Sequence, residues 1–189
     1  MQFIPLRLHL GNLWVNFVIE VVHGRKGSQL TQQQNPADMS RPYNSVLVAE
    51  YLQAVAYENR VRLNVTKTQK LLYILYGWFL AKHDVVILNE RPKAWPYGPV
   101  FPITREKADF DTVYTSDEAK FAELKRDSDL ANAVTYIVKA YSNYTAGQLS
   151  AWSHSKGGPW DKTTSRENFR WNDPIDDEDI KDYFKQIKL

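Results

Sequence analysis

The sequence has no cysteine among its 189 residues, which excludes disulfide bonds, cysteine-based zinc sites and thiol nucleophiles. It has no run of 18 or more apolar residues, so it predicts no transmembrane helix. The segment 1–22 is only superficially like a signal peptide, because polar residues interrupt it and it lacks a basic start and a small-residue cleavage site. We therefore expect a cytoplasmic protein.

Known catalytic motifs are also missing. The four histidines are scattered, and the sequence contains no H-E-x-x-H, G-x-S-x-G, P-loop or G-x-G-x-x-G motif. The acidic run 176–179 is more typical of a helix N-terminus than of a metal site. We predict a protein that is not an enzyme and that uses no metal and no cofactor.

Basic and acidic residues are nearly balanced in number. The chain has 24 basic and 22 acidic residues, a net charge of +2, and these residues are well mixed along its length. Phosphate binding usually requires a concentrated basic patch, so the charge distribution argues against nucleic acid as the main partner. The hydrophobic fraction of 43% is sufficient for a globular core.

The composition divides the chain into an extension and a compact domain. Residues 1–22 fit either a strand pair or an amphipathic helix, and residues 24–38 are rich in Gly, Ser, Gln and Asn, as in a flexible linker. We expect residues 39–189 to form one helical domain with a C-terminal helix at about 176–187. Translation could start at Met1 or at Met39, in which case residues 1–38 would not belong to the native product.

The stretch 66–100 organises the domain. Apolar side chains cover nearly every face of the segment 67–82, which predicts a central helix packed on several sides. Thr66 and Gln69 have the spacing of a capping box at its start. Further helices are expected at about 46–60 after Asn44, at 103–110, and at the amphipathic segment that begins at 128 or 129.

Two shorter segments complete the expected fold. Thr145 and Gln148 form a second capping box, which predicts a short helix to His154. The β-branched run 85–88 could form a short strand. The predicted fold class is mostly α, a compact helical domain around the buried helix 67–82 with at most small β elements.

The segment 94–100 (AWPYGPV) is a stiff aromatic corner, because Pro fixes φ and Gly permits unusual backbone shapes. Trp95 and Tyr97 could fill the core, anchor a partner, or divide these roles. Lys67 and Lys70 slightly oppose the dipole of their helix, a faint indication of another role. His154 could touch a ligand, but a helix-end histidine bonded to a nearby carbonyl is the more ordinary interpretation.

These segments resemble a known family. The residues 66–73 (TKTQKLLY), Trp78 and 94–100, followed by Ser153-His154 and Pro159-Trp160, are similar to the motifs of the Panacea domain, the SocA-like antitoxin family often carried by prophages. The resemblance covers roughly 43–164. Three motifs in the same order and at suitable separations carry it.

The resemblance implies the antitoxin of a type II toxin–antitoxin system, which neutralises a toxin from the adjacent gene by direct protein–protein interaction. It also implies a possible adaptor role toward an AAA+ protease. The alternative is a helical DNA-binding or transcription regulator, for which 67–70 is the only weak recognition segment. The toxin-binding candidates are Lys67, Lys70, Trp95, Tyr97, Gly98, Pro99, Val100, His154 and Trp160.

Overall fold

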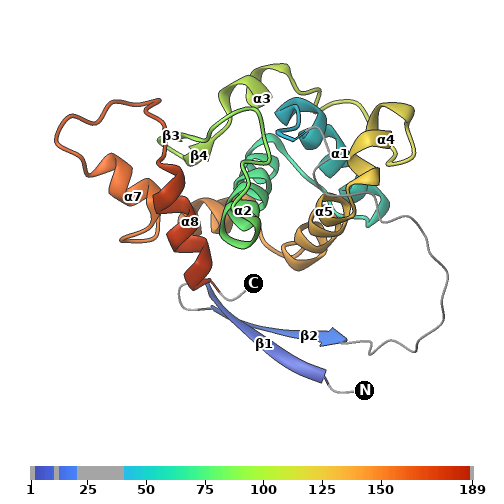
Figure 1. Cartoon of the computed structure of the whole chain (residues 1–189), viewed down its shortest axis with the longest axis horizontal. Helices are drawn as coiled ribbons and strands as arrows, with labels where there is room; N and C mark the ends of the chain where they lie inside the picture. The colour runs from blue at the N-terminus through green and yellow to red at the C-terminus, as the bar shows by residue number, and fades with distance from the viewer. Residues whose placement is uncertain (1–2, 11–12, 21–40, 188–189) are drawn as a thin grey trace.

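The computed structural model describes residues 3–10, 13–20 and 41–187. As expected, these residues are mostly helical, with two small antiparallel strand pairs (Figure 1). In chain order the elements are β1 Phe3–Leu10, β2 Leu13–Glu20, α1 Ser45–Glu58, α2 Val65–His83, β3 Lys93–Trp95, β4 Gly98–Val100, α3 Pro102–Lys107, the 3-10 turn η2 Ala119–Phe121, α4 Ala122–Arg126, α5 Ser128–Ala140, α6 Ala146–Ser153, α7 Pro159–Thr164 and α8 Asp177–Gln186.

The extension begins with a strand pair. Strand β1 pairs with β2 in antiparallel register from Phe3 opposite Glu20 to Leu10 opposite Leu13, so of the two alternatives for this segment the structure has the strands. The expected linker at 24–38 and the second possible start, Met39, lie outside the described residues. The division at residue 39 therefore stays a prediction.

Helix α2 is the centre of the helical domain, with α1 and α5 on one side and α8 on the other (Figure 1). Its residues Leu71, Leu72, Ile74 and Leu75 are fully buried. They contact neighbours on several sides, because α2 packs against α8, α6, α5 and β4. The predicted buried central helix is confirmed.

The capping box predicted at the start of α2 is wrong. The N-cap is Asn64, whose side-chain oxygen accepts a hydrogen bond from the backbone N–H of Lys67 at 2.8 Å. The Gln69 side chain does not bond the backbone at the start of the helix, because its Oε1 accepts a hydrogen bond from the backbone N–H of Phe101 at 2.7 Å. Thr66 lies inside the first turn, and the long-range bond of Gln69 is the reason that the local pattern misleads.

The other predicted caps agree with the structure. Asn44 caps α1, Thr145 and Gln148 form a capping box on α6, and Asp176 caps α8. Where α2 passes α8, a Cβ on Gly77 would collide with the ring of Phe184, so the glycine permits the close approach of the two helices.

The aromatic corner is a tight β-hairpin. Strands β3 and β4 pair from Lys93 opposite Val100 to Trp95 opposite Gly98, and Pro96 and Tyr97 form the turn. The possible strand at 85–88 does not form, since Leu88 makes only an isolated bridge to Tyr43. Within the described residues, no helix is long and apolar enough to cross a membrane.

Candidate functional site

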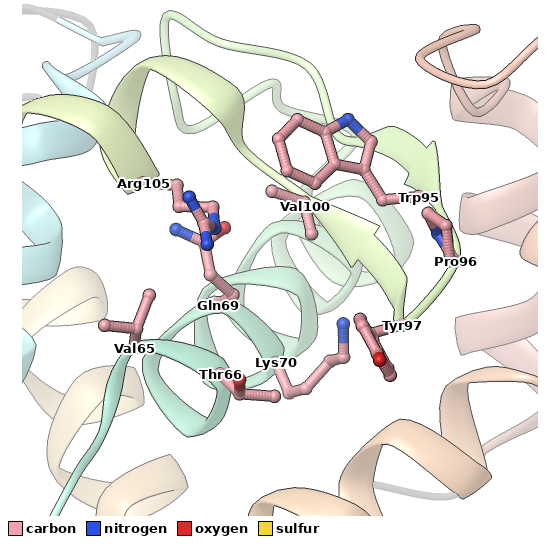
Figure 2. Close-up of a pocket in the computed structure, with 9 residues that line it drawn as sticks. All are labelled: Val65, Thr66, Gln69, Lys70, Trp95, Pro96, Tyr97, Val100 and Arg105. Atoms are coloured by element: carbon pink, nitrogen blue, oxygen red, sulfur yellow. The ribbon is translucent and has the colours of Figure 1, made fainter.

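A cavity of about 410 Å³ lies between the first turns of α2 and the β3–β4 hairpin. Figure 2 shows the side chains of α2 below it, the hairpin on its far side and Arg105 of α3 at its edge. Its lining combines basic, amide and aromatic groups. The lining residues are Val65, Thr66, Gln69, Lys70, Trp95, Pro96, Tyr97, Val100 and Arg105.

Lys70 is the most unusual group in this lining, because its side chain is only 1% exposed. Its Nζ donates a hydrogen bond to the carbonyl oxygen of Pro99 at 2.8 Å, and none of the described carboxylates forms an ion pair with it. Burial disfavours the charged form of an amine, and it lowers the pKa of Lys70 to about 7. An amine whose pKa is lowered by burial thus lines the cavity.

The hairpin approaches Lys70 closely because one of its residues is glycine. Gly98 has φ +96°, and a Cβ on it would meet Ser153 Oγ of α6 and Lys70 Nζ. Any other residue would both strain the backbone and force the hairpin away from α2 and α6. Gly98 therefore permits the close approach of the hairpin to Lys70 and Ser153.

Long-range hydrogen bonds hold the hairpin in place. The indole N–H of Trp160 donates to the Trp95 carbonyl at 2.9 Å, and the indole N–H of Trp95 donates to Asn172 Oδ1 at 3.0 Å. At the turn, Ser150 Oγ donates to the Tyr97 carbonyl at 3.2 Å. The Tyr97 side chain itself is 77% exposed, so a rigid backbone presents a free ring.

His154 lies behind the hairpin rather than in the cavity lining. It is the C-cap of α6, and its ring centroid is 4.0 Å from that of Trp160. The ordinary interpretation, a ring bonded to a carbonyl, is not seen for its buried Nε2, which has no hydrogen-bond partner among the described residues. Burial and, secondarily, the charge of Lys70 lower the pKa of His154.

The structure brings most of the predicted residues together. Lys70, Trp95, Tyr97 and Val100 line the cavity. Four further predicted residues contact the lining or stabilise it from behind, and they are Gly98, Pro99, His154 and Trp160.

Lys67 lies apart from this group. It is buried and donates from Nζ to the carbonyl of Ser142 at 2.8 Å, so it connects α2 to the segment between α5 and α6. With Lys67 and Lys70 both buried, the first turns of α2 offer no basic surface for a DNA groove.

Sequence reasoning missed five of the lining residues. Gln69 could have been identified from the sequence. A polar side chain in a helix that is apolar on nearly every face is expected to be buried and to need hydrogen-bond partners. Thr66 and Pro96 belong to the segments 66–73 and 94–100 singled out above, whereas nothing in the local pattern indicated Val65 or Arg105.

The fold and the site define a small helical domain with a hairpin-covered cavity, and comparison with known proteins identifies its class. Residues 68–161 match the family described as "Antitoxin SocA-like, Panacea domain". This segment contains every predicted site residue except Lys67. This part of the chain is thus similar to the SocA-like Panacea family, as the resemblance implied.

One relative supports the assignment. The protein named Antitoxin SocA from Caulobacter vibrioides (strain NA1000 / CB15N) is 29% identical over 134 residues, which cover 64% of this chain and 71% of the relative. No solved structure matches the chain. The similarity therefore concerns the family, and the geometry described above comes from this chain alone.

Proposed function

We propose that this chain is the antitoxin of a type II toxin–antitoxin system and that it neutralises a cognate protein toxin by direct binding, without catalysis. The family match and the name of the similar SocA protein support the antitoxin role. The observation that carries direct binding is the exposed Tyr97 on a hairpin fixed by surrounding hydrogen bonds.

The hairpin has the physical properties of a binding anchor. Aromatic side chains dominate the energetics of protein interfaces, and an ordered backbone reduces the entropy lost on association. Tyr97 stands beside the half-buried ring of Trp95, which the guanidinium of Arg105 covers at 5.6 Å from the ring centroid. An aromatic and cationic surface thus surrounds the mouth of the cavity.

Co-expression with the product of the adjacent gene tests the proposal. We expect the neighbour alone to stop growth, and this chain to restore growth while co-purifying with the neighbour as a stable complex. A harmless neighbour, or restored growth without any complex, would contradict neutralisation by direct binding.

The Tyr97→Ala variant tests the position of the interface. It should leave the free energy of unfolding within about 0.5 kcal/mol of wild type, as surface substitutions usually do. Removing an interface anchor should weaken toxin binding roughly tenfold or more. Calorimetric titration of the purified toxin into each variant measures the affinity, and urea unfolding measures the stability.

Tyr57 provides a matched control, since its side chain is 58% exposed on α1, outside the cavity lining. Tyr57→Ala should change neither folding nor toxin affinity. If both tyrosine variants bound the toxin like wild type, the interface would lie elsewhere on the chain.

The proposal extends to location and turnover. We propose that the complex forms in the cytoplasm and that the chain also delivers its toxin to an AAA+ protease, as the family resemblance implies. Toxin degradation in a reconstituted protease reaction should then require this chain. Equal degradation rates with and without the chain would exclude the adaptor role and leave neutralisation by binding intact.

A further inference from the structure

The cavity beneath the hairpin contains hydrogen-bond donors without acceptors. Gln69 is 2% exposed, and its Nε2 has no hydrogen-bond partner among the described residues. Its orientation is fixed, because its Oε1 must accept the backbone N–H of Phe101. Leaving a buried amide donor unpaired is unfavourable, so this group is expected to have a ligand.

Two basic side chains, Lys70 and Arg105, share the cavity with this amide. An ammonium has three donors, and Lys70 uses one of them on the Pro99 carbonyl. Arg105 lies over the Trp95 ring and forms no ion pair with the described residues. Figure 2 shows the side chains of Gln69, Lys70 and Arg105 around the cavity, with the Lys70 amine near Tyr97.

The rest of the lining also favours a negatively charged ligand. Val65 and Thr66 belong to the first turn of α2, a 19-residue helix whose N-terminus carries a partial positive charge. No described lining residue is acidic. The walls are apolar and aromatic, formed by Trp95, Val100 and the turn residues. The cavity volume of about 410 Å³ is within the range of small-ligand pockets.

We propose that this cavity binds a carboxylate joined to an apolar or aromatic body, with Lys70, Arg105 and the Gln69 amide as donors to the carboxylate and Trp95 and Val100 in contact with the body. The inference goes beyond the antitoxin role and does not depend on it. An acidic side chain of a partner protein and a free organic acid offer the same chemistry, and they are distinguished below.

Phenylacetate and its neutral analogue phenylacetamide test the charge requirement. Because hydrogen bonds to a charged group contribute about 1.5–3 kcal/mol, the wild-type chain should bind phenylacetate roughly tenfold or more tighter than phenylacetamide. Calorimetry or tryptophan fluorescence on the full chain measures both affinities. Equal affinities for the two probes would overturn the proposal.

Variants test the assigned donors. Lys70→Met and Arg105→Gln should each remove most of the preference for phenylacetate, and Arg105 is exposed, so its variant should keep the fold. Lys82→Met is the matched control, since Lys82 is a lysine of the same helix beside the Trp78 ring, away from the cavity. A preference unchanged in both cavity variants, or lost equally in the control, would also overturn the proposal.

Competition identifies the source of the carboxylate. If phenylacetate dissociates the complex with the product of the adjacent gene, an acidic side chain of that partner occupies the cavity. If phenylacetate binds and leaves the complex intact, the ligand is a free organic acid. If no complex forms, the proposed function fails, while the probe measurements still decide whether the cavity binds a carboxylate.

Discussion

Replacing Lys70 with Met should stabilise the fold most at low pH, and this advantage should shrink by about 4 kcal/mol between pH 6 and pH 10. The reason is the burial of the amine, which lowers its pKa from 10.5 to about 7 in the folded chain. Methionine has a similar shape and no charge, so its variant lacks this titration.

The sign follows from the proton balance. Between pH 7 and 10.5 the unfolded chain holds a proton on Lys70 that the folded chain has lost, so the stability of the wild type rises with pH in this window. Below pH 7 both states are protonated, and the folded state carries the full cost of a buried ammonium. The pKa of Lys67 is also lowered by burial, but that residue is present in both proteins and cancels in the comparison.

Urea unfolding of both proteins at several pH values measures this difference. Lys82→Met should follow the wild-type curve, because it removes an exposed amine from the same helix. A constant gap between wild type and Lys70→Met across the range would mean that the Lys70 amine is solvated in the folded chain. Its role as a buried donor would then be wrong.

The helices were predictable because their signals are local. The apolar residues of 67–82 could be buried only in a helix packed on several sides, and α5 carries a buried apolar stripe at helical spacing from Leu130 to Val138. The capping box of Thr145 and Gln148 satisfies the first turn of its own helix. Each of these patterns is complete within one segment, so no knowledge of the tertiary fold is needed.

The cavity was only partly predictable because its residues are joined by long-range contacts. Trp95 and Tyr97 stand out in any sequence, but Arg105 becomes part of the site only when α3 returns beside the hairpin (Figure 2). Whether an aromatic side chain lies in the core or on the surface also depends on the fold, which leaves Tyr97 exposed and the ring of Trp95 half-buried. The capping error at Thr66 has the same origin, since Gln69 bonds a residue 32 positions away.

A second long-range contact, missed from the sequence, fixes the position of α3. Glu90 is buried, and its two carboxylate oxygens accept hydrogen bonds from the Ile103 N–H at 2.6 Å, the Thr104 N–H at 3.1 Å, the Thr104 hydroxyl at 3.0 Å and the Ser45 hydroxyl at 3.0 Å. The N-cap residue of α3, Phe101, supplies no side-chain cap. Glu90 therefore caps α3 from a distance and joins it to the start of α1.

Glu90→Ala should lower the free energy of unfolding by about 3–5 kcal/mol, because it leaves several donors without an acceptor at a buried site. Glu90→Gln keeps one oxygen acceptor and should lose roughly half as much. Urea unfolding at neutral pH measures both changes. Glu106→Ala, an exposed glutamate of α3, should stay within about 0.5 kcal/mol of wild type.

The Glu90→Ala variant also tests whether the cap of α3 positions the cavity lining. Arg105 follows Thr104 directly, so release of the α3 start should displace the guanidinium from the Trp95 ring and reduce the preference for phenylacetate over phenylacetamide. Glu90→Gln, which retains part of the cap, should keep more of that preference than Glu90→Ala. If Glu90→Ala lost its stability but bound phenylacetate like wild type, α3 would be positioned by its apolar contacts instead. If its stability matched that of Glu106→Ala, the four hydrogen bonds would contribute no net free energy to folding.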